Sequence, residues 1–134
     1  METQLIKYIN YNILLRAKGL KYEVSHFAPN TFEDLINSSS LVVWSGESDN
    51  TIFQDETVNW AFRALHDALH LETRIGFTPQ EEIELGRIQA NQFDGILADL
   101  VYCEVAGQAE YYLKTGQFVT DQVEFTKQYL GGLL

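Results

Sequence analysis

Two histidines, His66 and His70, stand one helical turn apart in the stretch AFRALHDALHLET, which occupies residues 61–73. Side chains four residues apart lie on the same face of a helix, so two imidazole nitrogens at this spacing can reach one point. Together with a carboxylate from another helix, they form a ligand set that holds zinc or non-haem iron in helical proteins. The simpler alternative is a pair of histidines hydrogen-bonded to protein neighbours at the edge of a helix. The spacing is common, so a second feature has to decide between the two interpretations.

Glu104 is the carboxylate that the sequence places best for this role. A rotation of about 100° per residue surrounds it with side chains of the same helix that are mostly apolar. These neighbours are Leu97, Leu100, Val101, Gln108 and Tyr111. Burial of an unpaired carboxylate is costly, so a buried Glu104 has to be paired, hydrogen-bonded, bound to a metal or protonated. We therefore predict that His66, His70 and Glu104 are the ligands of a divalent metal, Zn, Fe or Mn.

The helix that carries the histidines is predicted to run over residues 55–73. Its apolar positions share one face about 120° wide, and Asn59 lies within about 40° of both histidines at the edge of that face. The three polar side chains should therefore be half-buried and close together. Asp67 points further toward water by the same rotation.

Glu104 belongs to a longer helical pattern with a clear start. Thr78 is the expected N-cap, Pro79 the first helical residue, and Glu81 completes a capping box. The sequence FDG at residues 93–95 predicts a break or kink, so we expect either two helices or one bent helix.

The rest of the chain predicts further helices and a pair of strands. A helix over residues 3–19 would end at Gly19, a short one would follow Asn30 or Thr31, and a last one would run from Thr120 to Gly131. LVVWSG, residues 41–46, is typical of a strand, and NTIF, residues 50–53, could return beside it as a hairpin. The expected fold class is α+β and mainly α-helical, with about five helices packed with one short β-hairpin in a single domain, residues 1–134.

Composition excludes several classes of function. Nineteen Asp and Glu against nine Lys and Arg give a formal net charge of -10. Nucleic acid would be repelled by this surface, whereas a basic protein partner or a cation would be attracted. The sequence has no apolar run of about 20 residues and no signal peptide, so we expect no membrane contact. The single cysteine, Cys103, is typical of a cytoplasmic protein and is expected to be a packing residue. Tyrosines and YLGGLL, residues 129–134, could form a contact in a homo-oligomer.

The stretch from Asn59 to Asp67 resembles the pattern N-x-x-F-R-A-V-H-D-x-x-G-H of uncharacterised proteins encoded by phages and their hosts. Three further blocks follow in order, with G-E-E and T-E-T-R-G-Q motifs among them, and the whole resemblance covers roughly residues 30–130. The matching residues are Phe77, Glu81 and Glu82, then Glu104, Gly107 and Gln108, then more loosely Phe125, Lys127 and Gln128. The chain departs from the pattern at the second histidine, because the glycine before it is absent and His70 comes one residue early. A more distant likeness links the histidines to the H-E-x-x-G-H and Glu ligands of iron-dependent aromatic amino-acid hydroxylases.

The resemblance implies that the polar residues of these blocks act together, although the family has no assigned reaction. On this basis Glu82 is a further ligand or supporting residue, and Asn59 and Gln108 orient the set. An open coordination position would activate water or oxygen, with Asp67 or Glu82 handling protons. The alternative is a non-enzymatic acidic phage protein, located in the host cytoplasm, that binds a host protein partner. The histidine and glutamate cluster would then be a structural polar network.

Overall fold

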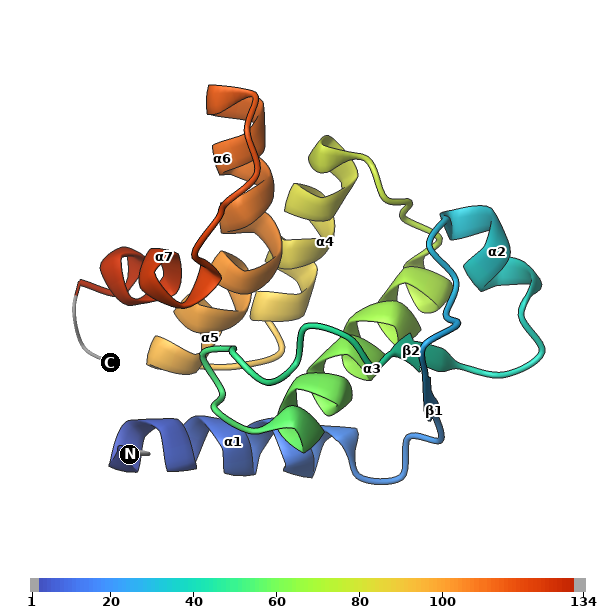
Figure 1. The fold of residues 1–134 in the computed structure, drawn as a ribbon, viewed down its shortest axis with the longest axis horizontal. Coiled ribbons are helices and arrows are strands. Elements are labelled where there is room, and N and C mark those ends of the chain that lie inside the picture. Colours follow the sequence, from blue (N-terminus) through green and yellow to red (C-terminus); the bar gives the residue numbers. More distant parts are fainter. Residues whose placement is uncertain (1–2, 132–134) are drawn as a thin grey trace. The chain divides into compact units, whose positions relative to one another are not determined.

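The computed structural model describes residues 3–131, which divide into two compact units. The first unit ends at Arg74 and the second begins at Ile75. Two compact units can belong to one domain that folds as a whole, so the prediction of a single domain stays a prediction. Over the described residues the chain is mainly helical with one small two-stranded sheet, which confirms the expected fold class (Figure 1). None of the helices in this part of the chain is both long and apolar enough to cross a membrane.

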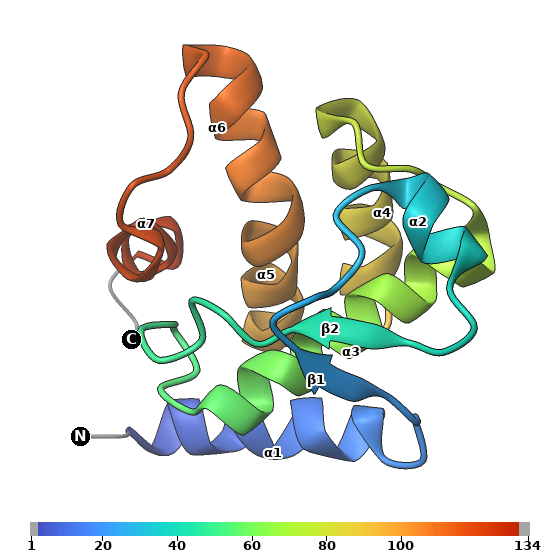
Figure 2. The same cartoon turned by 45° about the vertical axis from the view of Figure 1, so that its right-hand side comes forward.

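The first unit is built on two long helices that pack side by side (Figures 1 and 2). Helix α1, Gln4–Ala17, buries Ile6, Ile9 and Ile13, whose spacing of three and four residues places them on one face. Helix α3, Glu56–Thr73, begins at its N-cap Asp55, which accepts a hydrogen bond from the Val58 amide. It ends where Arg74 adopts a left-handed conformation, as predicted for a helix that stops near Thr73. The short helix α2, Phe32–Asn37, packs against α3.

The predicted hairpin is wrong in its pairing. Strand β2, Val42–Trp44, lies where LVVWSG predicted a strand, but its partner is β1, Glu23–Ser25, and the two strands are parallel. Figure 2 shows the two strands side by side, with α2 in the connection between them. The segment 50–53 forms a turn instead of a strand. Its apolar side chains are buried in the core, and the Asn10 amide donates to the Phe53 carbonyl at 2.8 Å, so this backbone is satisfied without a strand partner.

The second unit contains helix α4, Pro79–Ala90, which begins at the predicted capping box. The Glu81 amide donates to Thr78 Oγ1 at 3.2 Å, and the Thr78 amide donates back to the Glu81 carboxylate at 3.3 Å. The predicted break is also confirmed, because α4 ends before FDG and α5, Gly95–Tyr102, starts there with Gly95 at a φ of 59°. Positive φ is a conformation that glycine adopts at low cost.

Helix α5 continues without interruption through a π-helical turn, η1, Cys103–Gly107, into α6, Gln108–Thr115 (Figure 1). Helix α4 packs along this long helix, and Gly86 allows the close approach, because a Cβ at that position would lie 2.6 Å from the Ala106 Cβ. Helix α7, Gln122–Tyr129, completes the unit; its N-cap is Asp121, one residue after the predicted Thr120. Residues 132–134 of the proposed oligomer contact lie outside the described part of the chain.

Candidate functional site

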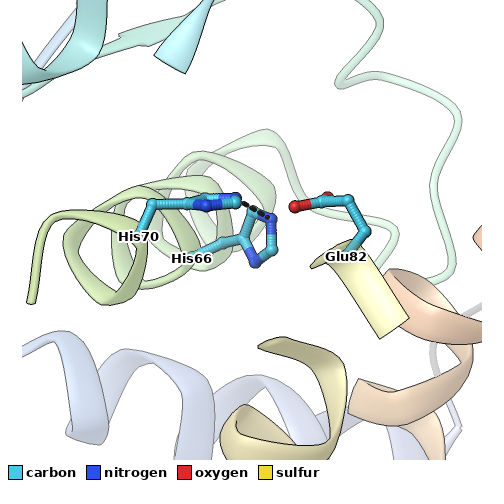
Figure 3. A group of neighbouring side chains, drawn as sticks. All are labelled: His66, His70 and Glu82. Carbon is cyan, nitrogen blue, oxygen red and sulfur yellow. Dashed lines mark hydrogen bonds between the residues drawn. The ribbon is translucent and has the colours of Figure 1, made fainter. Parts of the chain in front are cut away.

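His66 and His70 form a close pair on α3. Their Nε2 atoms lie 3.0 Å apart, and the two rings meet edge to face with centroids 4.5 Å apart (Figure 3). His70 is 1% exposed, whereas His66 is half-buried. The prediction that both imidazoles are half-buried is therefore confirmed for His66 and wrong for His70, which packs fully into the core.

The short distance between the two Nε2 atoms has two chemical interpretations. In a hydrogen bond, one neutral ring donates its N–H to the lone pair of the other ring. In a metal site, two bonds of about 2.0–2.1 Å at a tetrahedral angle would place the same nitrogens about 3.3 Å apart. The observed separation is within a few tenths of an ångström of that value, so a small rotation of either ring would turn the pair into a bidentate ligand.

Asn59 lies on the predicted face of α3 but contacts a loop. Its side-chain amide donates to Ser48 Oγ at 2.9 Å, and both residues are buried. One turn further on, Arg63 donates to the carbonyl oxygens of Trp44 and Gly46, at 2.5 and 2.6 Å. Two polar residues of the histidine helix thus hold the loop that follows β2, a structural role that the sequence did not reveal.

Asp67 follows His66 in the sequence and is half-buried. Its negative charge acts on the Arg63 guanidinium. Burial lowers the pKa of the Arg63 guanidinium, and the negative charges of Glu47 and Asp67 oppose that effect. The third histidine of the chain, His26, lies elsewhere: its Nδ1 is 3.0 Å from Ser45 Oγ at the end of the parallel strands.

Glu82 occupies the first turn of α4, where its own amide donates to the Thr78 carbonyl at 2.8 Å. Among the described residues, His66, His70 and Glu82 are the group that could hold a metal ion (Figure 3). Glu82 therefore stands in that group where the sequence analysis placed Glu104. The sequence offered Glu82 as a further ligand or a proton carrier, on the strength of the resemblance.

Glu104 lies in η1 and is held by another helix. Thr126 of α7 donates its hydroxyl to Glu104 Oε1 at 2.5 Å. Burial raises the pKa of Glu104 to about 7, and the hydrogen bond from Thr126 limits that rise. Of the states predicted for this carboxylate, the second unit thus favours a hydrogen-bonded and readily protonated one.

Glu104 also lines a cavity of about 500 Å³ whose described walls all belong to the second unit. Gln108, which the sequence paired with the metal ligands, lines the same cavity, and so does Glu82. Cys103 is fully buried, and burial raises the pKa of its thiol to about 12, so the thiol is protonated at neutral pH. Its predicted role as a packing residue fits this environment.

Comparisons of the chain with protein-family models, with curated proteins and with solved structures return no match. The resemblance to the phage-type proteins therefore stays a prediction that depends on the four motif blocks.

Proposed function

We propose that the protein binds a divalent transition metal through Nε2 of His66, Nε2 of His70 and the carboxylate of Glu82. The observation that carries the proposal is the 3.0 Å separation of the two Nε2 atoms. In a hydrogen bond between the rings one Nε2 carries the proton and only the other offers a lone pair, whereas a metal needs the lone pairs of both Nε2 atoms. A change of tautomer moves the proton of the donating ring to Nδ1 and frees its Nε2 for the metal. The identity of the third ligand is supported by the chemistry of the group, two imidazoles and one carboxylate.

This ligand set selects among metals by its chemistry. Imidazole and carboxylate donors suit zinc, iron and manganese, whereas thiolate donors are absent from the group. Two histidines and one glutamate are the protein ligands of hydrolytic zinc sites, and two histidines and one carboxylate are those of oxygen-activating iron sites. In both classes, three protein ligands leave at least one coordination position for water or substrate.

The expected chemistry is activation of the molecule in that open position. A divalent ion bound by three protein ligands lowers the pKa of a bound water, which makes hydroxide available near neutral pH. Asp67 is the other acidic residue that the sequence analysis offered for proton transfer, and it keeps that assignment here. Glu82 is assigned to the metal in this proposal and no longer to the proton.

The proposal is tested by metal analysis and titration of protein purified without chelator. We expect one equivalent of metal, and titration with Co(II) should give the absorption of a four- or five-coordinate ion. The variants His66→Ala, His70→Ala and Glu82→Gln should each weaken binding at least about tenfold, the range seen when supporting or coordinating groups are removed. A metal at about 100 times its Kd should stabilise the fold by about 2.7 kcal/mol.

Two matched variants control for general effects. His26→Ala removes the third histidine, which contacts Ser45, and Glu84→Gln removes an exposed carboxylate from α4, two residues after Glu82. Both should bind metal as the wild type does. Metal-free protein whose melting temperature ignores added zinc, iron and manganese would overturn the proposal and favour the structural polar network. Equal loss of metal on Glu104→Gln would restore Glu104 as the ligand and contradict our choice of Glu82.

A further inference from the structure

The cavity of the second unit has the size of a small-molecule site. Its volume of about 500 Å³ lies within the range of about 300–1,000 Å³ that ligand pockets occupy. Its walls come from α4, η1, α6 and the segments before α4 and after α6. The lining residues are Phe77, Pro79, Glu82, Glu104, Val105, Gln108, Ala109, Tyr112 and Phe118.

The charged side chains of the lining favour a cationic ligand. The two ionisable carboxylates are those of Glu82 and Glu104, and the lining residues that the structure describes include no lysine, arginine or histidine. An anion would meet only repulsion from these groups, whereas a cation would meet attraction in a partly dehydrated site. Thr126 occupies one acceptor position of the Glu104 carboxylate, which has about four, so further donors can be accommodated.

The remaining wall is largely apolar and aromatic. The rings of Tyr112 and Phe118 stack with centroids 4.7 Å apart and an interplanar angle of 24°. Both residues line the cavity, and Phe118 is 78% exposed, so its ring surface is accessible to a ligand there. Aromatic faces attract cations as well as apolar groups, which complements the carboxylates.

We infer that this cavity binds a small organic cation, a primary amine with an aromatic body, whose ammonium group meets Glu104 and whose ring packs against Tyr112 and Phe118. The inference goes beyond the proposed metal site and does not depend on it. Glu104 lies in the π-helical turn, which interrupts the regular α-helix on this wall of the cavity. Such turns frequently occur at functional sites.

The test uses the whole chain with a chelator present, so that metal plays no part. Phenethylamine is the probe, 2-phenylethanol its neutral analogue and 3-phenylpropanoate its anionic analogue. Amide NMR spectra recorded at about pH 8, where carboxylates are ionised and the amine is protonated, should show phenethylamine shifting residues of η1, α6 and the loop at Phe118. We expect a Kd in the millimolar range or below, because a ligand this small makes few contacts. The neutral analogue should bind at least about tenfold more weakly, and the anion should not bind.

Matched variants separate the site from general effects of charge and surface. Glu104→Gln keeps an oxygen for the Thr126 hydroxyl and should weaken amine binding at least about tenfold, whereas Glu84→Gln on the exposed side of α4 should not. Phe118→Ala should weaken binding, whereas Phe27→Ala, which removes a ring that is 91% exposed in the first unit, should not.

Three results would overturn the inference: equal binding of 3-phenylpropanoate, shifts confined to residues outside the cavity, or unchanged affinity in a folded Glu104→Gln variant. Failure of this proposal is distinguishable from failure of the metal proposal. A His66→Ala variant that binds no metal should still bind phenethylamine as the wild type does, because His66 is not a lining residue of the cavity.

Discussion

Replacement of Glu104 by glutamine should remove the loss of stability that the desolvated Glu104 carboxyl causes as the pH rises. Glutamine has nearly the same shape as protonated glutamate, and its amide oxygen can accept the hydroxyl of Thr126 as the carboxylate does. At acidic pH, where Glu104 is protonated in both the folded and the unfolded chain, the two proteins should therefore have similar free energies of unfolding.

The difference between them should grow as the pH rises. The unfolded chain loses the Glu104 proton near the ordinary pKa of 4.5, whereas the folded chain keeps it until about 7. Between these values the folded state binds more protons than the unfolded state, so the wild type loses stability as the pH rises. The difference between about 7 and 4.5 corresponds to about 3 kcal/mol. Above about pH 7.5 the glutamine variant should be the more stable protein by an amount of this order, and no further change should follow.

The assay is urea unfolding of both proteins at a series of pH values from about 4 to 8, which spans both pKa values. Far-UV circular dichroism is the suitable signal, because Trp44 and Trp60 both lie in the first unit and Glu104 lies in the second. Glu84→Gln, which removes the same charge from an exposed position of α4, is the control for net charge. Its difference from wild type in free energy of unfolding should stay nearly constant over this pH range. For Glu104→Gln, a stability difference that stays constant across this pH range would refute the reasoning, and so would a glutamine variant less stable than wild type at about pH 8.

Two packing contacts give further predictions. Gly86→Ala should destabilise the second unit by about 1–3 kcal/mol in urea unfolding, because the new Cβ would meet that of Ala106 at 2.6 Å. Addition of Ala106→Gly should recover most of this loss. An unchanged free energy of unfolding in the single variant would contradict the close approach of the two helices. Arg63→Ala should destabilise the first unit by about 2 kcal/mol and shift the fluorescence of Trp44, whose carbonyl oxygen and ring it contacts, whereas Arg16→Ala, at an exposed position of α1, should leave both unchanged.

Local signals in the sequence predicted most of the helices. The capping box of Thr78, Pro79 and Glu81 fixes the start of α4 because its residues satisfy the first amides of the helix themselves. The break at 93–95 follows from Gly95, whose positive φ a helix interior excludes. Both effects depend on residues that are close together in the chain, so the sequence alone reveals them.

The sheet could not be predicted in the same way. Strand β1 has three residues, too few to show the alternation of apolar and polar residues that indicates a strand. Their partner lies about twenty residues later, beyond α2, and parallel pairing at such a distance leaves no turn signal. Phe53, by contrast, is 1% exposed because it packs against Phe62, with ring centroids 5.3 Å apart. A short apolar run of this kind resembles a strand in sequence whether or not its backbone is paired.

The choice of metal ligand shows the same limit. Helical rotation predicted burial of Glu104; the structure desolvates its carboxyl, although the residue as a whole is half-buried. The rotation could not show that Thr126, from a different helix, would satisfy the carboxylate. Nor could it choose between Glu82 and Glu104 as the carboxylate of the group that could hold a metal ion, because periodicity describes one helix at a time.

Glu82 belongs to both proposals, and this shared residue predicts that metal and amine compete. It is assigned to the ion, and it also lines the cavity that we assign to the amine. An ion on Glu82 would neutralise one of the two carboxylates of the cavity and bring positive charge to its wall, so phenethylamine should bind several-fold more weakly to zinc-loaded protein than to protein in chelator. Because coupling between two ligands is reciprocal, saturating phenethylamine should raise the Kd of zinc by the same factor. Titrations of each ligand with and without the other measure this factor. Tighter amine binding in the presence of zinc would mean that the amine nitrogen itself binds the ion, and would contradict the separate placement of the two ligands.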